Sequence, residues 1–166
     1  MDHGDILKKA RFFAGFTGDE VAAFLAAGAR QRVPDGHVFL HMGSPNASLF
    51  VILGGSVKVE RLGVAENVPL ATLPAGETFG EMSFTDGSRT TARLSAVGPT
   101  EVLAVSRASF DALLGERPAM WGKFWHNLAL ELMDRLSKTN KLVDHYADVN
   151  QLLVDNPSYR ESMSRV

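Results

Sequence analysis

The chain contains no cysteine among its 166 residues. Disulfide bonds, thiol catalysis and thiolate zinc sites are therefore excluded. Long apolar runs are also missing, since no stretch approaches the roughly 18 consecutive apolar residues of a membrane-spanning helix. The first residues, Met-Asp-His-Gly-Asp, lack the basic start and the apolar core of a secretory signal peptide. These features predict a cytoplasmic protein with no membrane segment.

An excess of charge is missing too, because 17 lysines and arginines nearly balance 19 aspartates and glutamates and leave a net charge of −2. A dedicated nucleic-acid-binding domain usually carries a basic stripe, so direct DNA binding is not expected. Apolar residues make up 45% of the chain, as in an ordinary globular core. The length fits one domain, or one domain with an appended helix.

Helical periodicity is present at both ends of the chain. Near the N-terminus, apolar residues predict a short helix over Asp5–Phe13 and a second over Asp19–Ala29, preceded by a capping-box pattern at Thr17 and Glu20. Toward the C-terminus, Ser106 can cap a helix over Arg107–Gly115. A long helix of about 28 residues follows, with Pro118 in its first turn.

The predicted long helix carries an apolar line with three- and four-residue steps, interrupted by Arg135. This line resembles a weak coiled-coil seam and predicts a homodimer through the helix. The alternative is a helix that folds back on its own domain. For the tryptophans of the line, core packing is the simpler role. The members of the line are Trp121, Trp125, Leu128, Leu132, Thr139, Leu142 and Tyr146, and a frayed polar tail is predicted over Asn156–Val166.

The middle of the chain, from Arg32 to Ser106, has a strand pattern instead. Short apolar or alternating runs are separated by segments rich in glycine, proline, asparagine and aspartate, which are typical of turns. Two of these segments are Gly54-Gly55 and Val97-Gly98-Pro99, so the runs on either side of each are expected to be separate strands. Such spacing predicts an antiparallel sandwich or barrel.

One stretch interrupts the strands, Gly76–Ala92, and it has the features of an anion-binding site. Gly80–Phe84 can form one helical turn, whose first N–H groups lack helical partners and attract phosphate. Glu81 can accept a hydrogen bond from a sugar hydroxyl, and Arg89 offers a planar set of donors to phosphate oxygens. The stretch therefore predicts a phosphorylated-sugar site. Alternatively, Glu81 only compensates the helix dipole, and Arg89 pairs with Asp86 in a solvated loop.

Taken together, these segments resemble the cyclic-nucleotide-binding domain family over roughly residues 13–144. The resemblance implies a mainly β fold, a β-jelly roll with N-terminal helices, a short phosphate-binding helix and a long C-terminal helix. It divides the chain into N-terminal helices (1–30), the jelly roll (31–106) with its phosphate-binding segment (76–92), C-terminal helices (107–147) and a tail (148–166). The segments that carry it are Val33-Pro-Asp-Gly-His-Val-Phe-Leu, His41-Met-Gly-Ser-Pro, Leu49-Phe-Val-Ile-Leu-Gly-Gly-Ser-Val-Lys-Val and Leu73-Pro-Ala-Gly-Glu-Thr-Phe-Gly-Glu-Met-Ser-Phe.

The resemblance also implies a function and a set of contacts. The function is that of a regulatory sensor that binds cAMP or cGMP and signals through the long helix to an unidentified output protein. No catalysis, cofactor or metal is implied. Glu81 would hold the ribose 2′-hydroxyl, Gly80 and Met82 would supply amides, Arg89 would bind the phosphate, and Thr90 or Thr91 would reach the phosphate or the base. The full implied ligand-binding set is Phe79, Gly80, Glu81, Met82, Ser83, Arg89, Thr90 and Thr91.

The register around Arg89 leaves two alternatives open. Counting back from Arg93–Ala96 puts Thr90 at the family's arginine position, and counting forward from Glu81 leaves the loop before Arg89 one residue short. A one-residue shift turns a strand side chain to the opposite face. Either the loop absorbs the difference and Arg89 points inward, or the phosphate site lacks its guanidinium. In the second case the domain is a dimeric protein-interaction module that binds no nucleotide.

Two further functions are disfavoured by the residues. A cupin-type metal enzyme needs clustered histidines with a carboxylate; His37 and His41 share one strand face, but no third ligand follows at a recognisable spacing. A DNA-binding module would need about 50 residues, whereas about 20 follow Tyr146. A stand-alone domain without such a module is therefore expected.

Overall fold

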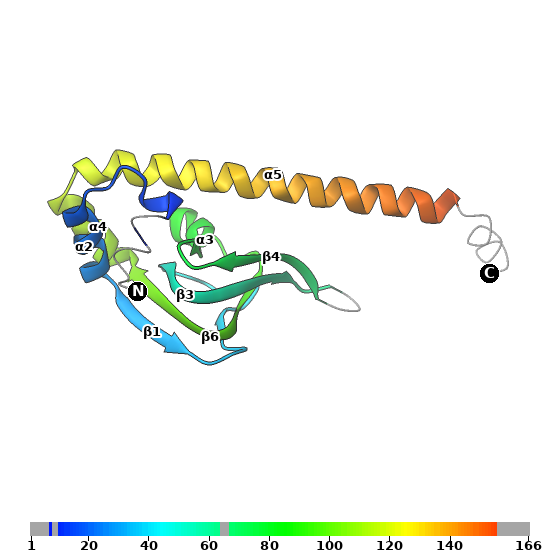
Figure 1. Cartoon of the computed structure of the whole chain (residues 1–166), viewed down its shortest axis with the longest axis horizontal. Coiled ribbons are helices and arrows are strands. Elements are labelled where there is room, and N and C mark those ends of the chain that lie inside the picture. The colour runs from blue at the N-terminus through cyan, green and yellow to red at the C-terminus, as the bar shows by residue number, and fades with distance from the viewer. Residues whose placement is uncertain (1–6, 8–9, 64–66, 156–166) are drawn as a thin grey trace. The chain divides into compact units, whose positions relative to one another are not determined.

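The computed structural model describes residues 7, 10–63 and 67–155, with only the main chain described at 142 and 145–155. The chain divides into two units, Met1–Leu128 and Ala129–Val166, and each is described by itself. The described elements, drawn in Figure 1, are η1 (Arg11–Phe13), α2 (Gly18–Ala27), β1 (Ala29–Val33), β2 (Val38–Leu40), β3 (Ser48–Arg61), β4 (Val68–Pro74), β5 (Thr78–Phe79), α3 (Glu81–Asp86), β6 (Arg93–Ser106), α4 (Arg107–Glu116) and α5 (Ala119–Asp155).

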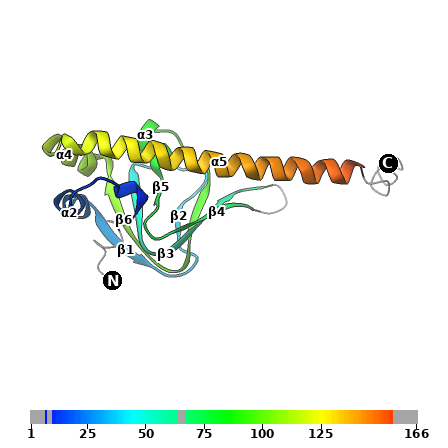
Figure 2. The same cartoon turned by 45° about the horizontal axis from the view of Figure 1, so that its top comes forward.

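Within the described residues, the strands form one six-stranded antiparallel sheet that rolls up around the core. β6 is its central strand and pairs with β1, β2 and β3. β3 also pairs with β4 and with the short β5, which Figure 2 shows beside it. The expected fold class, a mainly β jelly roll with flanking helices, is confirmed.

The strand boundaries differ from the sequence pattern at two places. The predicted turns at Gly54-Gly55 and at Val97-Gly98-Pro99 are wrong, because both lie inside the continuous 14-residue strands β3 and β6. The register between the two strands shifts around Gly54, so the segments are bulges that bend both strands without separating them. Gly55 has φ +78, and a Cβ there would lie 2.6 Å from the Pro99 carbonyl oxygen.

The interior of the roll is filled by alternate apolar residues of its strands, as the period of two requires. Phe50 and Phe79 stack with ring centroids 4.7 Å apart, and Phe39 packs against both. Burying such a side chain stabilises the fold by about 1.5–3 kcal/mol. The buried members of the cluster are Leu40, Phe50, Ile52, Val57, Leu73, Phe79, Ala92, Leu94 and Val102.

The predicted helices α2 and α4 are confirmed, with their caps. Thr17 accepts a hydrogen bond from the Glu20 N–H (3.2 Å), and the Glu20 carboxylate accepts one from the Thr17 N–H (2.7 Å). Lys123, at the start of α5, donates to the same carboxylate at 2.7 Å. Hydrogen bonds from Lys123 and from the Thr17 main chain hold the pKa of Glu20 below its ordinary value. Ser106 caps α4, which buries Phe110, Leu113 and Leu114.

Most of the predicted Asp5–Phe13 helix lies outside the described residues. Its described end, Arg11–Phe13, is one turn of 3-10 helix, with Phe12 and Phe13 buried. The side-chain amide of Asn127 donates to the Phe12 carbonyl (2.7 Å) and to the Ala14 carbonyl (2.9 Å). This buried amide therefore ties the N-terminal turn to the first turns of α5.

Helix α5 has 37 residues, so the predicted length of about 28 is wrong, and residues 148–155 are helical rather than part of a tail. In the first unit its buried line is Met120, Phe124 and Leu128. The Trp121 side chain is 52% exposed, so core packing is wrong for this tryptophan. The side chains of Leu142 and Tyr146 and the predicted Asn156–Val166 tail lie outside the described residues. None of the described helices has the length and apolar character needed to cross a bilayer.

Candidate functional site

The candidate site begins at the sharp turn between β5 and α3. Gly80 forms this turn with φ 78 and ψ 2, a left-handed conformation that costs other residues about 1–2 kcal/mol. The space around it is also closed. A Cβ at this position would lie 3.0 Å from the Asn46 amide nitrogen, 3.1 Å from the Ser48 carbonyl oxygen and 3.3 Å from the Phe50 ring. Both the conformation and the space therefore require glycine.

The first turn of α3 is held from outside the helix. The Gly80 carbonyl accepts the Phe84 N–H at 3.0 Å and the side-chain amide of Asn46 at 3.1 Å. The Asn46 amide also lies 3.1 Å from the Ser83 hydroxyl. The sequence pattern did not single out Asn46, because a loop asparagine is ordinarily explained by local turn bonding. Its reach to a segment 34 residues away is visible only in the structure.

The predicted residues of this turn separate into buried and exposed ones. Phe79, Glu81 and Ser83 are buried, with the Glu81 residue only 6% exposed, whereas Met82 is 51% exposed. Phe79 belongs to the aromatic core through its stack on Phe50. Ser83 is bonded to Asn46, so its hydroxyl supports the main chain of the turn. Glu81 thus brings a carboxylate largely out of water directly after the glycine turn.

The loop after α3 has its own polar contacts. α3 ends at Gly87 with φ 71, and the Ser88 N–H donates to the Asp86 carboxylate at 2.8 Å. Hydrogen bonds from the Ser88 hydroxyl and main chain hold the pKa of Asp86 below its ordinary value. The Arg89 guanidinium donates to the Gly43 carbonyl at 2.7 Å. Among the described residues, the alternative pair between Arg89 and Asp86 is therefore not formed.

Thr90 is bound by the loop between β2 and β3. Its main chain exchanges hydrogen bonds with this loop, from the Gly43 N–H to the Thr90 carbonyl (2.7 Å) and from the Thr90 N–H to the Ser44 carbonyl (2.9 Å). The Thr90 hydroxyl accepts the Ser44 N–H at 3.2 Å and also bonds to the His41 carbonyl. With the residue 6% exposed, the hydroxyl is surrounded by the loop His41–Ser44.

Side-chain burial alternates along this segment. Thr90 and Ala92 are buried, whereas Arg89 and Thr91 are exposed. The residue that faces inward is thus Thr90, the residue that the register count from β6 places at the family's arginine position. Arg89 lies on the surface beside the same loop, bonded to Gly43.

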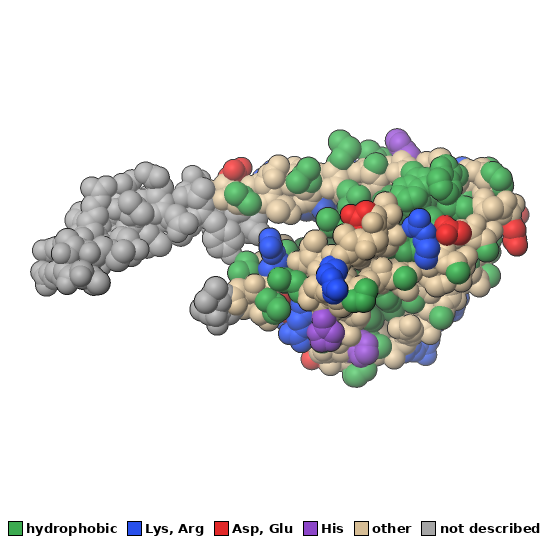
Figure 3. Space-filling view, turned by 180° about the vertical axis from the view of Figure 1, so that it is seen from behind, with side chains coloured by type: hydrophobic (Ala, Val, Ile, Leu, Met, Phe, Trp, Pro, Cys, Tyr) green, Lys and Arg blue, Asp and Glu red, His purple; other side chains and the backbone are tan. Residues whose placement is uncertain are grey.

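The described residues contain no group of three or more histidine, cysteine, aspartate or glutamate side chains that could hold a metal ion. His37 and His41, the pair that a cupin-type site would use, are both exposed. Figure 3 shows both basic and acidic side chains on the face that it draws.

Residues 30–117, more than half of the chain, match the family described as "Cyclic nucleotide-binding domain". The chain belongs to this family. The cyclic AMP receptor protein of Thermus thermophilus is 34% identical over 140 residues, which are 83% of this chain and 62% of the receptor. A cGMP-dependent protein kinase of Caenorhabditis briggsae is 31% identical over 115 residues, which are 68% of this chain and 15% of the kinase. The chain therefore spans less than two thirds of either relative.

Solved structures agree with this assignment. The structure of a cyclic nucleotide-binding domain from Methylobacillus flagellatus superposes with a TM-score of 0.75 at 27% identity, covering 84% of this chain and 79% of that one. The resemblance seen in the sequence is thus confirmed at the level of both family and fold. The two relatives named above are thus a receptor protein for cyclic AMP and a protein kinase that depends on cGMP.

Proposed function

We propose that this domain is a non-enzymatic regulatory sensor that binds a cyclic nucleotide, cAMP or cGMP. One observation carries the proposal: the segment that matches the cyclic nucleotide-binding family contains the Gly80 turn, followed at once by a buried carboxylate, Glu81. A carboxylate out of water forms a strong hydrogen bond with a ligand hydroxyl, because few water molecules compete for it. The expected cytoplasmic location and the unidentified output protein belong to the same proposal.

In this proposal different residues of the site bind the ribose and the cyclic phosphate. Glu81 accepts the ribose 2′-hydroxyl, and the main-chain N–H groups of Gly80 and Met82 bind the cyclic phosphate. Phe79 and Ser83 support this turn from below, through the Phe50 stack and the Asn46 amide. The exposed Thr91 is available to the ligand, whereas the Thr90 hydroxyl stays with the loop that it holds.

Arg89 is the proposed phosphate ligand, and it must give up one contact to act. Its guanidinium donates to the neutral Gly43 carbonyl at 2.7 Å. A phosphate oxygen is the stronger acceptor, because charge-assisted hydrogen bonds are about twice as strong as neutral ones. In this proposal the Arg89 guanidinium exchanges the Gly43 carbonyl for the phosphate when the nucleotide binds.

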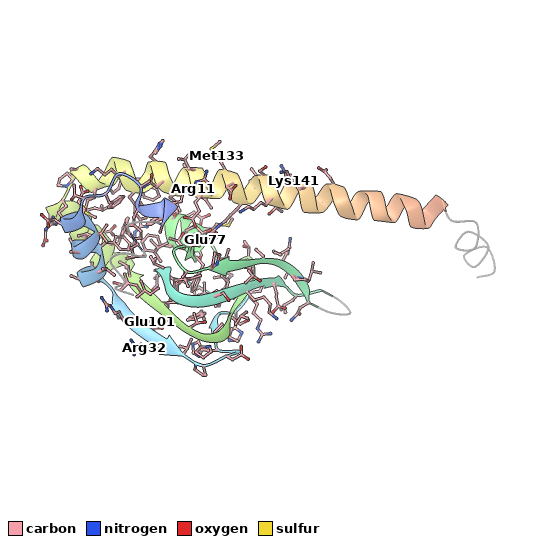
Figure 4. The ribbon with its side chains drawn as sticks, in the orientation of Figure 1. Arg11, Arg32, Glu77, Glu101, Met133 and Lys141 are labelled. Atoms are coloured by element: carbon pink, nitrogen blue, oxygen red, sulfur yellow. The ribbon has the colours of Figure 1, made fainter. Side chains whose placement is uncertain are left out.

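Isothermal titration calorimetry of the full chain with cAMP and with cGMP tests the proposal. We expect heat of binding with at least one nucleotide, and Arg89→Ala should weaken it by about 10- to 100-fold, as expected for a charged hydrogen bond of about 1.5–3 kcal/mol. Arg32→Ala is the matched control, because Arg32 lies on β1 and pairs with Glu101 at 3.0 Å, as labelled in Figure 4. No heat with either nucleotide at millimolar concentration would reject the proposal.

A second candidate function is a protein-interaction module that binds no nucleotide. It is favoured by one observation: the inward-facing position after the α3 loop is occupied by Thr90, whose hydroxyl is already bonded by His41–Ser44. Under this function, Arg89→Ala changes neither folding nor association, and titration with both nucleotides gives no heat. The same calorimetry therefore separates the two functions.

Under both functions we propose a homodimer through α5. Considered by itself, the second unit carries Met133, Leu136 and Val143 with 66%, 61% and 60% of their side-chain surface exposed. With Asn140, they follow the three- and four-residue steps of a coiled-coil seam, a line of residues different from the one predicted from the sequence. A seam asparagine is a common register-setting residue. Sedimentation velocity should show a dimer that Leu136→Asp converts to monomer, while Lys138→Ala, off the seam, should leave it intact. A monomeric wild-type protein would contradict the dimer.

A further inference from the structure

Asn46 joins the loop before β3 to the start of α3. Its amide nitrogen lies within hydrogen-bonding distance of the Ser48 carbonyl (2.8 Å), the Gly80 carbonyl (3.1 Å) and the Ser83 hydroxyl (3.1 Å). Its amide oxygen accepts the Ser48 N–H at 3.0 Å. Because the Ser48 N–H can only donate, this last contact fixes which end of the carboxamide faces α3.

The main chain at Gly80 needs such an external contact. Glycine has the widest conformational freedom of all residues, and Gly80 supplies no capping side chain, so α3 begins without a side-chain cap. The carbonyl of Gly80 instead accepts from the Phe84 N–H at 3.0 Å, from the Asn46 amide at 3.1 Å and from the Ser83 hydroxyl at 3.3 Å. A side chain from another loop thus contacts the start of α3 by donating to its first carbonyl, whereas a helix cap accepts from the first N–H groups.

The contact between Asn46 and the Gly80 carbonyl also determines the direction of the neighbouring Glu81 N–H. The peptide unit is planar and trans, so the Gly80 C=O and the Glu81 N–H point in opposite directions. With its oxygen turned toward Asn46, the Gly80–Glu81 peptide turns the Glu81 N–H to the opposite side. The same contact fixes the peptide plane from which the Glu81 residue continues.

We infer that Asn46 is a positioning residue of the nucleotide site, acting through the Gly80 carbonyl on the main chain and carboxylate of Glu81. The part of this inference that concerns affinity rests on the proposed cyclic-nucleotide binding. The part that concerns the turn does not, because both partners of each hydrogen bond belong to the protein.

Amide hydrogen exchange of the ligand-free protein, followed by NMR, tests the turn directly. The probe is the Phe84 N–H, which is bonded to the Gly80 carbonyl at 3.0 Å. In Asn46→Ala we expect its exchange to accelerate about tenfold, the equivalent of one hydrogen bond of about 1.4 kcal/mol. Asn46→Asp keeps the acceptor for the Ser48 N–H but loses the donors to Gly80, so it should show at least the same acceleration.

Calorimetry with cAMP and cGMP on the same variants tests the affinity, and we expect about tenfold weaker binding in both. Thr17→Ala is the matched control, because it removes the cap of α2 at a cost of about 1 kcal/mol and leaves the Gly80 turn untouched. Its Phe84 exchange and its affinity should match the wild-type values.

The possible outcomes either support or overturn the role of Asn46. Unchanged Phe84 exchange in Asn46→Ala overturns the inference, whatever the wild type binds. Accelerated exchange with unchanged affinity, in a wild type that binds nucleotide, also overturns it. If the wild type binds neither nucleotide, the proposed function fails, and accelerated exchange still supports Asn46 as the residue that positions the turn.

Discussion

The two sides of the candidate site are built in different ways. On the first side, Gly80 is half-buried and Glu81 is buried, and the Gly80 carbonyl accepts hydrogen bonds from Asn46 and from the Phe84 N–H. On the second side, Arg89 is exposed, and its guanidinium donates a hydrogen bond of 2.7 Å to the Gly43 carbonyl. The neighbouring Thr90 is buried, but its hydroxyl belongs to the β2–β3 loop.

The Gly80–Glu81 side is formed by folding of the domain, whereas the proposed phosphate contact of Arg89 forms only when a ligand binds. The Gly80–Glu81 side lies next to the hydrophobic core, because Phe79 precedes Gly80 in the chain and stacks on Phe50, whose ring is close to Gly80. It is therefore formed as soon as the roll is formed. The Arg89 side contributes little to the core, so its geometry can change without a large cost in stability. Variants on the two sides should consequently differ in their effect on folding.

Gly80→Ala should give the largest effect. We expect a loss of about 2–5 kcal/mol in the free energy of unfolding, because backbone strain adds to overpacking against Asn46 and Ser48. Gly87→Ala is the control, since Gly87 has a similar φ of +71 but nothing within 4 Å of an added Cβ, and it should lose only about 1–2 kcal/mol. Urea unfolding measures both. Equal losses would show that the space around Gly80 is not tight.

Thr90→Val should come next. The substitution keeps the shape but leaves the Ser44 N–H without the hydroxyl that accepts it at 3.2 Å, which should cost about 1–3 kcal/mol. Thr91→Val, at the exposed neighbouring position, should stay within about 0.5 kcal/mol of wild type. Thermal unfolding of the two variants makes the comparison. A stable Thr90→Val would mean that the loop is held by main-chain bonds alone.

Arg89→Ala should have almost no effect on stability. Its side chain is exposed, so the free energy of unfolding should change by no more than about 0.5 kcal/mol, against the several kcal/mol of Gly80→Ala. Urea unfolding beside the Gly80 variants gives the contrast directly. A loss above about 1 kcal/mol would place Arg89 in the structural part of the site and remove the difference between the two sides.

The smallest expected effect is the titration of Asp86, the last residue of α3. Its folded pKa is lowered by hydrogen bonds from Ser88, so its contribution to stability is present above the unfolded pKa and is lost as pH falls through the folded pKa. Ser88→Ala should raise the pKa of Asp86 without restoring its ordinary value, because the main-chain N–H still donates at 2.8 Å. NMR titration of the carboxyl carbon reports the change. An unchanged pKa would exclude the Ser88 hydroxyl as its cause.

Much of this fold can be predicted from the residues alone. The capping box at Thr17 and Glu20 and the cap at Ser106 are local patterns, and both are confirmed. The jelly roll follows from the order of strand patterns and the family resemblance. Glycine pairs are harder to interpret, because the same freedom that allows a hairpin turn also allows a bulge. Only the pairing of β3 with β6 on both sides of Gly54 distinguishes the two.

The candidate site is predictable in part for a similar reason. A register count from β6 identifies Thr90 as the inward-facing residue, since strand parity is a local property. Asn46 could not be found in this way, because its contact with Gly80 joins residues 34 positions apart. The position of the Arg89 side chain depends on the β2–β3 loop, which no periodicity describes.

At the bulge in β3, the adjacent glycines Gly54 and Gly55 differ in whether there is space for a side chain. A Cβ at Gly55 would collide with the Pro99 carbonyl, whereas a Cβ at Gly54 would meet nothing within 4 Å. Because the chain has no cysteine of its own, Gly54→Cys would create a single thiol at an uncrowded bend of the sheet. A fluorophore attached there would report on that bend with no competing label elsewhere in the protein.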